Sequence, residues 1–87
     1  MYFVYVLYSV KYRKIYIGFT KNLKQRLLSH NKLSKKGYTL RYRPWIVVFT
    51  EEYNLKTEAM KREKLLKTGK GREYIKRKLK ESGLLSA

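Results

Sequence analysis

The sequence predicts an α+β domain in which a small antiparallel three-stranded sheet is flanked by helices, in the order β-β-α-β-α-α. Three observations lead to this fold class. Three stretches rich in β-branched and aromatic residues predict strands, and apolar residues at helical spacing after the second and third stretches predict helices. The chain has 87 residues, enough for one domain with a single modest core. We expect that domain to cover residues 1–81, followed by a short tail at 82–87.

The first two predicted strands should form an antiparallel hairpin. Residues 1–9 (MYFVYVLYS) are apolar almost throughout, which indicates burial on both faces. Residues 15–19 form the second strand, in which Tyr16 and Gly18 share a face. The polar link between the strands is too short for a crossover. If the loop has an even number of residues, Tyr5 and Tyr16 are close or diagonal neighbours on one face.

A helix is predicted to follow the hairpin at residues 22–30. Asn22 is a suitable N-cap, and Leu23 and Leu27 are spaced to face the core. Arg26 and His30 lie one helical turn apart, on a face that differs from that of the leucines.

A basic loop is predicted at residues 31–43, before Pro44 and a third apolar strand at residues 45–50 (WIVVFT). Its cations are expected to contact a phosphate backbone without reading sequence. They are Lys32, Lys35, Lys36, Arg41 and Arg43.

Two helices are predicted to complete the domain. The first covers residues 54–67, and its apolar side comprises Leu55, Ala59, Met60 and Leu66. Gly69 is expected to end it in the left-handed conformation. The second covers residues 72–80 and buries Ile75 and Leu79, after which the tail is expected to fray.

Charge is the most informative property of the composition. Lysine and arginine total 22 against 6 acidic residues, which gives a net charge of +16. Self-repulsion of this size destabilises a compact fold, so a polyanionic partner is expected, and nucleic acid is the commonest one. A generally basic surface that binds nothing in particular remains the alternative.

Several other classes are excluded or disfavoured by composition. No apolar run approaches the roughly 20 residues that a membrane-spanning helix needs, so no membrane role is expected. The chain has no cysteine, which excludes disulfides and thiolate metal sites and suits a reducing cytoplasm. The N-terminus lacks the basic segment and cleavage site of a signal peptide.

All six acidic residues are glutamates, so a site that needs a cluster of carboxylates would be hard to assemble. Glu58 is spaced to pair with Arg62 on the solvent side of its helix. Glu63 instead falls on or beside the apolar face, where a carboxylate needs a partner. That partner is either a metal ion or Lys67 at i, i+4.

Two half-motifs with fixed spacing reveal a family resemblance. They are Val4-Tyr5-Val6 and Tyr16-Ile17-Gly18, with ten residues between the two tyrosines. The pattern continues through Asn22-Leu23, Arg26-Leu27, His30-Asn31, RPW at 43–45 and EAMKREKLLKTGKGREYIKRKL at 58–79. This ordered set resembles a small stand-alone GIY-YIG nuclease domain, and is also similar to the N-terminal nuclease domain of the bacterial excinuclease. Phe3 and Val4 depart from the family's glycine and isoleucine, which affects packing rather than chemistry.

The resemblance implies a Mg²⁺-dependent endonuclease, with Mn²⁺ as a substitute metal, that hydrolyses phosphodiester bonds by in-line attack of water. DNA is favoured over RNA, with a link to DNA repair or recombination, and substrate shape or a protein partner would supply selectivity. The implied catalytic residues are Tyr5, Tyr16, Arg26, His30 and Glu63, with Glu63 also holding the metal. Substrate contacts are predicted at Gly18, where the missing side chain would let a phosphate come close, and at the basic turn between the last two helices, with Lys67, Lys70 and Arg72.

Each of these residues also has an ordinary structural interpretation. Tyr5 and Tyr16 could be strand filler in a chain with nine tyrosines. Arg26 and His30 could form a solvated helix flank, with His30 favourably placed against the helix dipole. Gly18 could mark a simple bulge instead of a hollow that a phosphate enters. The rival function is a basic nucleic-acid-binding module without catalysis.

Overall fold

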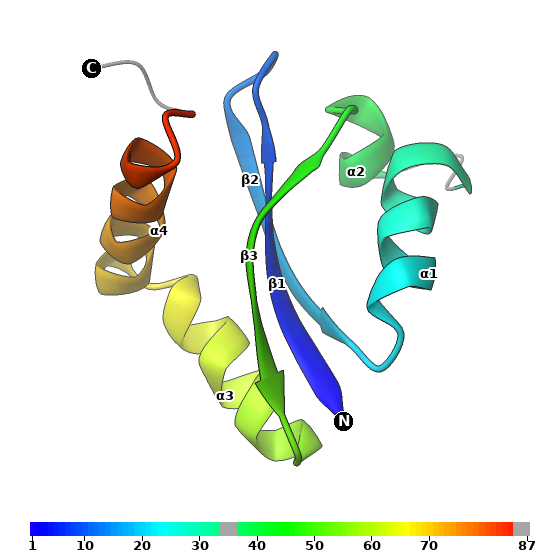
Figure 1. Ribbon diagram of the computed structural model, residues 1–87, viewed down its shortest axis with the longest axis vertical. Coiled ribbons are helices and arrows are strands. Elements are labelled where there is room, and N and C mark those ends of the chain that lie inside the picture. The colour runs from blue at the N-terminus through cyan, green and yellow to red at the C-terminus, as the bar shows by residue number, and fades with distance from the viewer. Residues whose placement is uncertain (34–36, 85–87) are drawn as a thin grey trace.

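The computed structural model describes residues 1–33 and 37–84 and confirms the predicted α+β fold. The elements are β1 (Tyr2–Ser9), β2 (Lys14–Thr20), α1 (Leu23–Leu28), the π-helix η1 (Ser29–Leu33), α2 (Tyr38–Arg41), β3 (Ile46–Tyr53), α3 (Lys56–Leu66) and α4 (Gly69–Glu81). Figure 1 shows the sheet as a middle layer, with α1 and α2 on one side and α3 and α4 on the other. No helix in the described ranges is long and apolar enough to cross a membrane.

The sheet has the strand order β2-β1-β3, with both pairings antiparallel, so the most apolar strand is the central one. Residues 4–9 of β1 are all buried, as predicted. Ser9 pairs with Lys14, so the loop at residues 10–13 has four residues. Tyr5 therefore pairs with Gly18 and lies on the same face as Tyr16.

Alternation along β1 divides the apolar side chains into two clusters, one on each side of the sheet. The cluster beneath α3 and α4 contains Val4, Val6, Tyr8, Ile17, Ala59, Leu66, Ile75 and Leu79. The cluster beneath α1 contains Tyr5, Leu7 and Trp45, with Tyr16, Leu23, Leu27 and Tyr42 packed against it. Tyr5 and Tyr16 thus face α1, while Ile17 faces α3 and α4.

The first helix begins as predicted, but its end differs. The Asn22 side chain accepts a hydrogen bond from the Gln25 N–H at 3.0 Å, which confirms the N-cap. At Ser29 the α-helix is followed directly by the π-helix η1, which continues past His30 to Leu33. A short helix, α2, lies within the segment predicted to be loop, while Lys35 and Lys36 fall outside the described residues.

The third strand and the following helix differ from the prediction in three details. The strand continues to Tyr53, because Glu51 and Tyr53 still pair with β1. Leu55 and Met60 are exposed and do not belong to the buried side of α3, which Ala59 and Leu66 form alone. The ladder thus takes up residues 51–53, for which no element was predicted, and α3 begins at Lys56.

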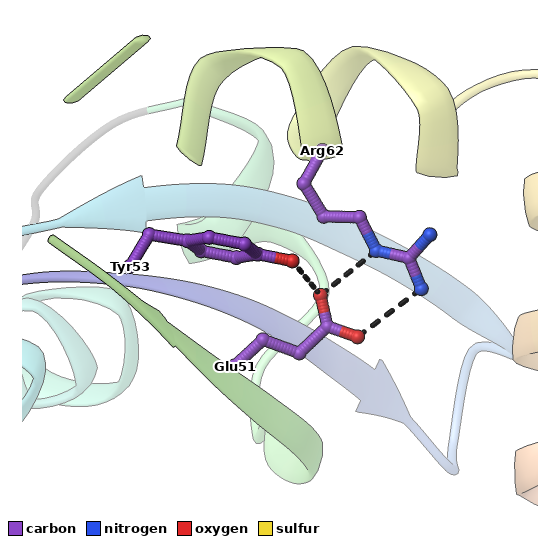
Figure 2. A network of polar contacts seen from close by, with 3 residues as sticks. All are labelled: Glu51, Tyr53 and Arg62. Carbon is purple, nitrogen blue, oxygen red and sulfur yellow. Dashed lines mark hydrogen bonds and ion pairs between the residues drawn. The ribbon is translucent and has the colours of Figure 1, made fainter. Parts of the chain in front are cut away.

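Arg62 pairs with Glu51 and not with Glu58 (Figure 2). Its Nε and Nη2 donate to the two carboxylate oxygens at 2.8 and 3.1 Å, and the Tyr53 hydroxyl donates to Oε1 at 2.9 Å. The guanidinium also lies 5.3 Å from the centre of the Tyr74 ring. A two-pronged pair of this kind has a fixed geometry, so it joins β3 to α3 and α4.

Gly69 does not end α3 in the left-handed conformation, contrary to the prediction. It is the first residue of α4, and Thr68 caps that helix by accepting the Gly71 N–H at 3.3 Å. Among the described glycines, positive φ occurs at Gly37 and Gly83. The tail also differs in part, since Leu84 packs against the core and residues 85–87 lie outside the described residues.

Gly71 is buried where the first turn of α4 contacts the end of α3. A Cβ atom there would collide with the carbonyl oxygen of Leu65 and the backbone of Leu66. We expect Gly71→Ala to lower the free energy of unfolding by about 1–3 kcal/mol, because backbone cannot move aside as a flexible side chain can. Thermal or urea unfolding measures the change.

Gly69→Ala is the matched control, because a Cβ at Gly69 meets nothing within 4 Å. We expect this variant to be neutral or more stable by about 0.4–1 kcal/mol, since alanine restricts the unfolded chain. Equal effects of the two substitutions would contradict the close contact between α3 and α4.

Candidate active site

Tyr5 lies at the centre of the site and is 1% exposed. Its hydroxyl is 2.8 Å from Nε2 of His30, and its ring centre is 6.2 Å from that of Tyr16. A Cβ at Gly18 would lie 2.6 Å from the Tyr5 hydroxyl oxygen. Tyr5 therefore fills the space beside Gly18, and the open hollow predicted there is absent.

His30 is buried, so it is not part of a solvated helix flank. It stands in η1, and short π-helical segments are often found at functional sites. Burial lowers the pKa of His30, and the positive charges of Arg26 and Arg43 lower it further. The imidazole is consequently neutral at pH 7 and forms one hydrogen bond with the phenol of Tyr5.

The phenol of Tyr5 is held in its protonated form. Burial raises the pKa of Tyr5 most, Tyr16 raises it further, and Arg26 partly offsets these effects. The carboxylate of Glu63 adds a smaller increase, so it lies within electrostatic reach of the phenol. Tyr5 is therefore a poor general base and is better suited to donating a hydrogen bond.

Tyr16 lines an open pocket of about 360 Å³ at the outer edge of β2. Because β2 is an edge strand, side chains from both faces of the sheet meet there: Ile15 and Ile17 point to one side and Tyr16 to the other. Lys67 and Arg72 complete the rim together with Tyr38. Two of the predicted substrate-binding cations thus converge on Tyr16.

Lys70 is exposed in the first turn of α4 and does not line this pocket.

Glu63 forms an ion pair with Lys67, which lines the pocket. Its side chain is 20% exposed, and Oε1 is 3.6 Å from Nζ of Lys67, which is the i, i+4 ion pair anticipated as the alternative to a metal. The carboxylate therefore does not point into bulk solvent, although α3 packs on the opposite side of the sheet from α1 (Figure 1). The ion pair with Lys67 keeps the carboxylate near the pocket.

Arg26 does not line the pocket that contains Tyr16. It is exposed and lines a separate pocket of about 650 Å³ that also contains Lys21 and Lys56. Its charge nevertheless lowers the pKa of both Tyr5 and His30. The structure thus places Arg26 near the Tyr5–His30 pair but outside the pocket lined by Tyr16.

The residue types present fit only one kind of metal site. No group of three or more histidine, cysteine, aspartate or glutamate side chains is gathered within residues 1–33 and 37–84. A metal at Glu63 would therefore have fewer than three such protein ligands among the described residues. Mg²⁺ tolerates this arrangement, because it keeps several waters and takes further oxygens from substrate phosphates.

Two residues that support the site were not identified from the sequence as site residues. Tyr38 lies in α2 and lines the pocket. Asn31 accepts the backbone N–H of Trp45 at 2.7 Å and donates to its carbonyl oxygen at 3.1 Å, which fixes η1 against the start of β3. The adjacency of Asn31 to His30 in the motif was the available signal for it.

Arg43 was predicted to contact phosphate, and in the structure it forms hydrogen bonds within the protein. Its guanidinium donates to the carbonyl oxygens of Ser29 and His30. These bonds pair carbonyl groups of η1 with a donor and hold His30 in position.

Comparison with known proteins shows which family the chain belongs to. The sequence profile of the GIY-YIG catalytic domain matches residues 1–79. A UPF0213 protein of Staphylococcus haemolyticus is 34% identical over 74 residues, which cover 85% of this chain and 89% of the relative. UPF0213 proteins of Staphylococcus saprophyticus and Staphylococcus aureus are 33% and 36% identical, covering 80% and 76% of this chain and 88% and 79% of the relatives.

No solved structure matches this chain. The profile nevertheless spans nearly all of it, and the two half-motif tyrosines meet on one face of the hairpin. The chain therefore belongs to the GIY-YIG family, a nuclease family whose substrates are nucleic acids.

Proposed function

We propose that the protein is a Mg²⁺-dependent endonuclease that hydrolyses phosphodiester bonds in DNA. The observation that carries this proposal is the convergence of Tyr16, Lys67 and Arg72 on one open pocket, with the carboxylate of Glu63 beside it. A binding module needs the cations, and in it Glu63 would serve only as the ion-pair partner of Lys67.

The cations of the pocket bind the phosphate that is to be cut. Lys67 supplies a point charge, and the guanidinium of Arg72 supplies a planar pair of donors. Lys67 would exchange its contact with Glu63 for one with the phosphate. Glu63 is then free to hold Mg²⁺, which would act as a Lewis acid and neutralise charge on the phosphate; Mn²⁺ is expected to substitute.

Proton transfer falls to the tyrosines and His30. Water attacks phosphorus in line with the leaving oxygen, and the Tyr16 phenolate takes the proton of the attacking water. The bond from phosphorus to the leaving oxygen breaks, and that oxygen takes a proton from solvent. The ring of His30 lies 4.8 Å from that of Tyr16, and Tyr5 is hydrogen-bonded to His30. This neutral pair positions Tyr16 and provides a route for the proton to leave.

Arg26 is assigned to the growing negative charge on the phosphate. Its charge lowers the pKa of both Tyr5 and His30, although Arg26 lines a pocket separate from that of Tyr16. A donor of this kind typically lowers the barrier by about 3 kcal/mol. Gly18 and Lys70 have weaker support as substrate contacts, because Tyr5 fills the space beside Gly18 and Lys70 lies outside the pocket.

The wider role is inferred from composition and family. The charge of +16 supports binding to DNA or RNA, and the family favours DNA, with repair or recombination in the cytoplasm as the setting. Substrate shape or a protein partner is proposed to select the site of cutting.

The direct test incubates the protein with single-stranded, duplex and branched DNA, with Mg²⁺ or with EDTA. We expect metal-dependent cutting of at least one DNA form, and binding in EDTA that weakens steeply with salt, because phosphate contacts release counterions. Salt-sensitive binding without cutting under any metal condition would favour the non-catalytic binding module instead.

A further inference from the structure

A line of three tyrosines extends from the pocket along the surface toward the hairpin loop. We call Tyr38, Tyr42 and Tyr12 the tyrosine strip. Successive ring centres are 6.2 Å apart from Tyr16 to Tyr38, 4.8 Å from Tyr38 to Tyr42, and 5.5 Å from Tyr42 to Tyr12. Tyr38 and Tyr12 are 44% and 42% exposed, so the strip is a surface feature and not part of the core.

Tyr38 is the best-fixed member of the strip. Its ring stacks on that of Trp45 at 5.8 Å and 28°, and its hydroxyl donates to the carbonyl oxygen of Ile15 at 3.4 Å. Trp45 is itself buried and donates from Nε1 to the carbonyl oxygen of Thr39 at 2.7 Å. An exposed aromatic ring that is held in this way loses little conformational entropy when another flat group stacks on it.

Cations accompany the strip along its length. The ammonium of Lys14 lies 5.3 Å and the guanidinium of Arg41 5.8 Å from the centre of the Tyr42 ring, and Lys11 lies 5.3 Å from that of Tyr12. The sequence from residue 1 to residue 50 contains no acidic residue. The strip therefore combines flat aromatic surface with uniformly positive charge.

These are the two features by which proteins bind single-stranded nucleic acid: rings on which bases stack and cations that follow the backbone. Duplex DNA offers the second contact but not the first, because its bases are already stacked on one another. An acidic peptide would likewise use only the cations. The geometry thus favours a strand with unpaired bases over either alternative.

We infer that the tyrosine strip binds unpaired nucleotides and that the substrate is single-stranded, or carries a single-stranded segment, at the site of cutting. The base next to the phosphate in the pocket stacks on Tyr38, and the following bases continue over Tyr42 and Tyr12. Lys14 and Arg41 then release the Tyr42 ring and contact phosphates. The inference rests on the proposed function only for the position of the cut.

Binding measured in EDTA tests this inference without requiring catalysis. Fluorescence anisotropy compares a labelled single-stranded oligonucleotide with its own duplex, for the wild type, Tyr38→Ala and Tyr38→Phe. We expect Tyr38→Ala to weaken binding of the single strand by roughly tenfold or more, as loss of one stacking contact does. Duplex binding should change less than twofold, and Tyr38→Phe should behave as the wild type in both.

A second measurement covers the case in which Tyr38→Ala disturbs α2. Single strands with one 2-aminopurine are titrated with the wild-type protein, and we expect the fluorescence of at least one position to change as that base stacks. No change at any position, or an equal loss of single-strand and duplex affinity in Tyr38→Ala, would overturn the inference. Neither outcome depends on whether the protein cuts DNA.

Discussion

Glu63→Gln is expected to reduce the rate of DNA cutting by at least about 100-fold, because a carboxamide holds Mg²⁺ poorly and metal assistance is worth several kcal/mol. Affinity for DNA in EDTA should be unchanged or higher, since the substitution removes a negative charge and frees Lys67 from its ion pair. Single-turnover cutting at saturating protein measures the first effect, and anisotropy with the same DNA measures the second.

Glu81→Gln is the matched control for this substitution. Glu81 also forms an ion pair with a lysine of its own helix, Lys78, at 4.0 Å, and it lies at the end of α4. Both variants lose one charge and one ion pair, but only Glu63 lies beside the pocket. Equal cutting rates for the two variants would show that Glu63 is merely a partner of Lys67.

Tyr16→Phe is expected to reduce cutting by about 10²–10⁴-fold, the usual contribution of a positioned acid–base group. Stability should change less than cutting, although the substitution removes the hydrogen bond between the Tyr16 and Tyr5 side chains. Single-turnover cutting rates, together with thermal unfolding, separate these effects.

Tyr5→Phe is the variant with which Tyr16→Phe is compared. It leaves the buried Nε2 of His30 without its partner at 2.8 Å, so it should lower the free energy of unfolding by about 1–3 kcal/mol. Its loss of cutting at a temperature where it stays folded should be smaller than that of Tyr16→Phe. The reverse order, with Tyr5→Phe the more defective enzyme, would assign the base to Tyr5.

The parts of the fold that follow from local patterns were predictable. Alternation of side chains and a short loop define the hairpin, and one side-chain oxygen defines the start of α1. The four-residue helix α2 was not predictable, because it is held by tertiary contacts such as the bond from Trp45 to Thr39. Helical spacing likewise could not identify Glu51 as the partner of Arg62, since they lie on different elements.

The site could be predicted only where the family motif names a residue. The hairpin pattern indicated that Tyr5 and Tyr16 would be neighbours if the loop had an even number of residues, and with its four residues they are. The motif gave no indication that Tyr5 fills the space beside Gly18, or that Arg26 and Tyr16 line different pockets. These are consequences of how the helices pack on the two faces of the sheet. Tyr38 was missed because its importance comes from stacking on Trp45.

The central claim is that Glu63 holds the metal beside Tyr16, and paramagnetic broadening by Mn²⁺ tests it most directly. Backbone amide signals of the protein are recorded as Mn²⁺ is added at sub-stoichiometric amounts. We predict that broadening is strongest at Glu63, Lys67 and Tyr16 and that Glu63→Gln abolishes this pattern. Broadening centred on Glu73 or Glu81, or a pattern that Glu63→Gln leaves unchanged, would contradict the claim.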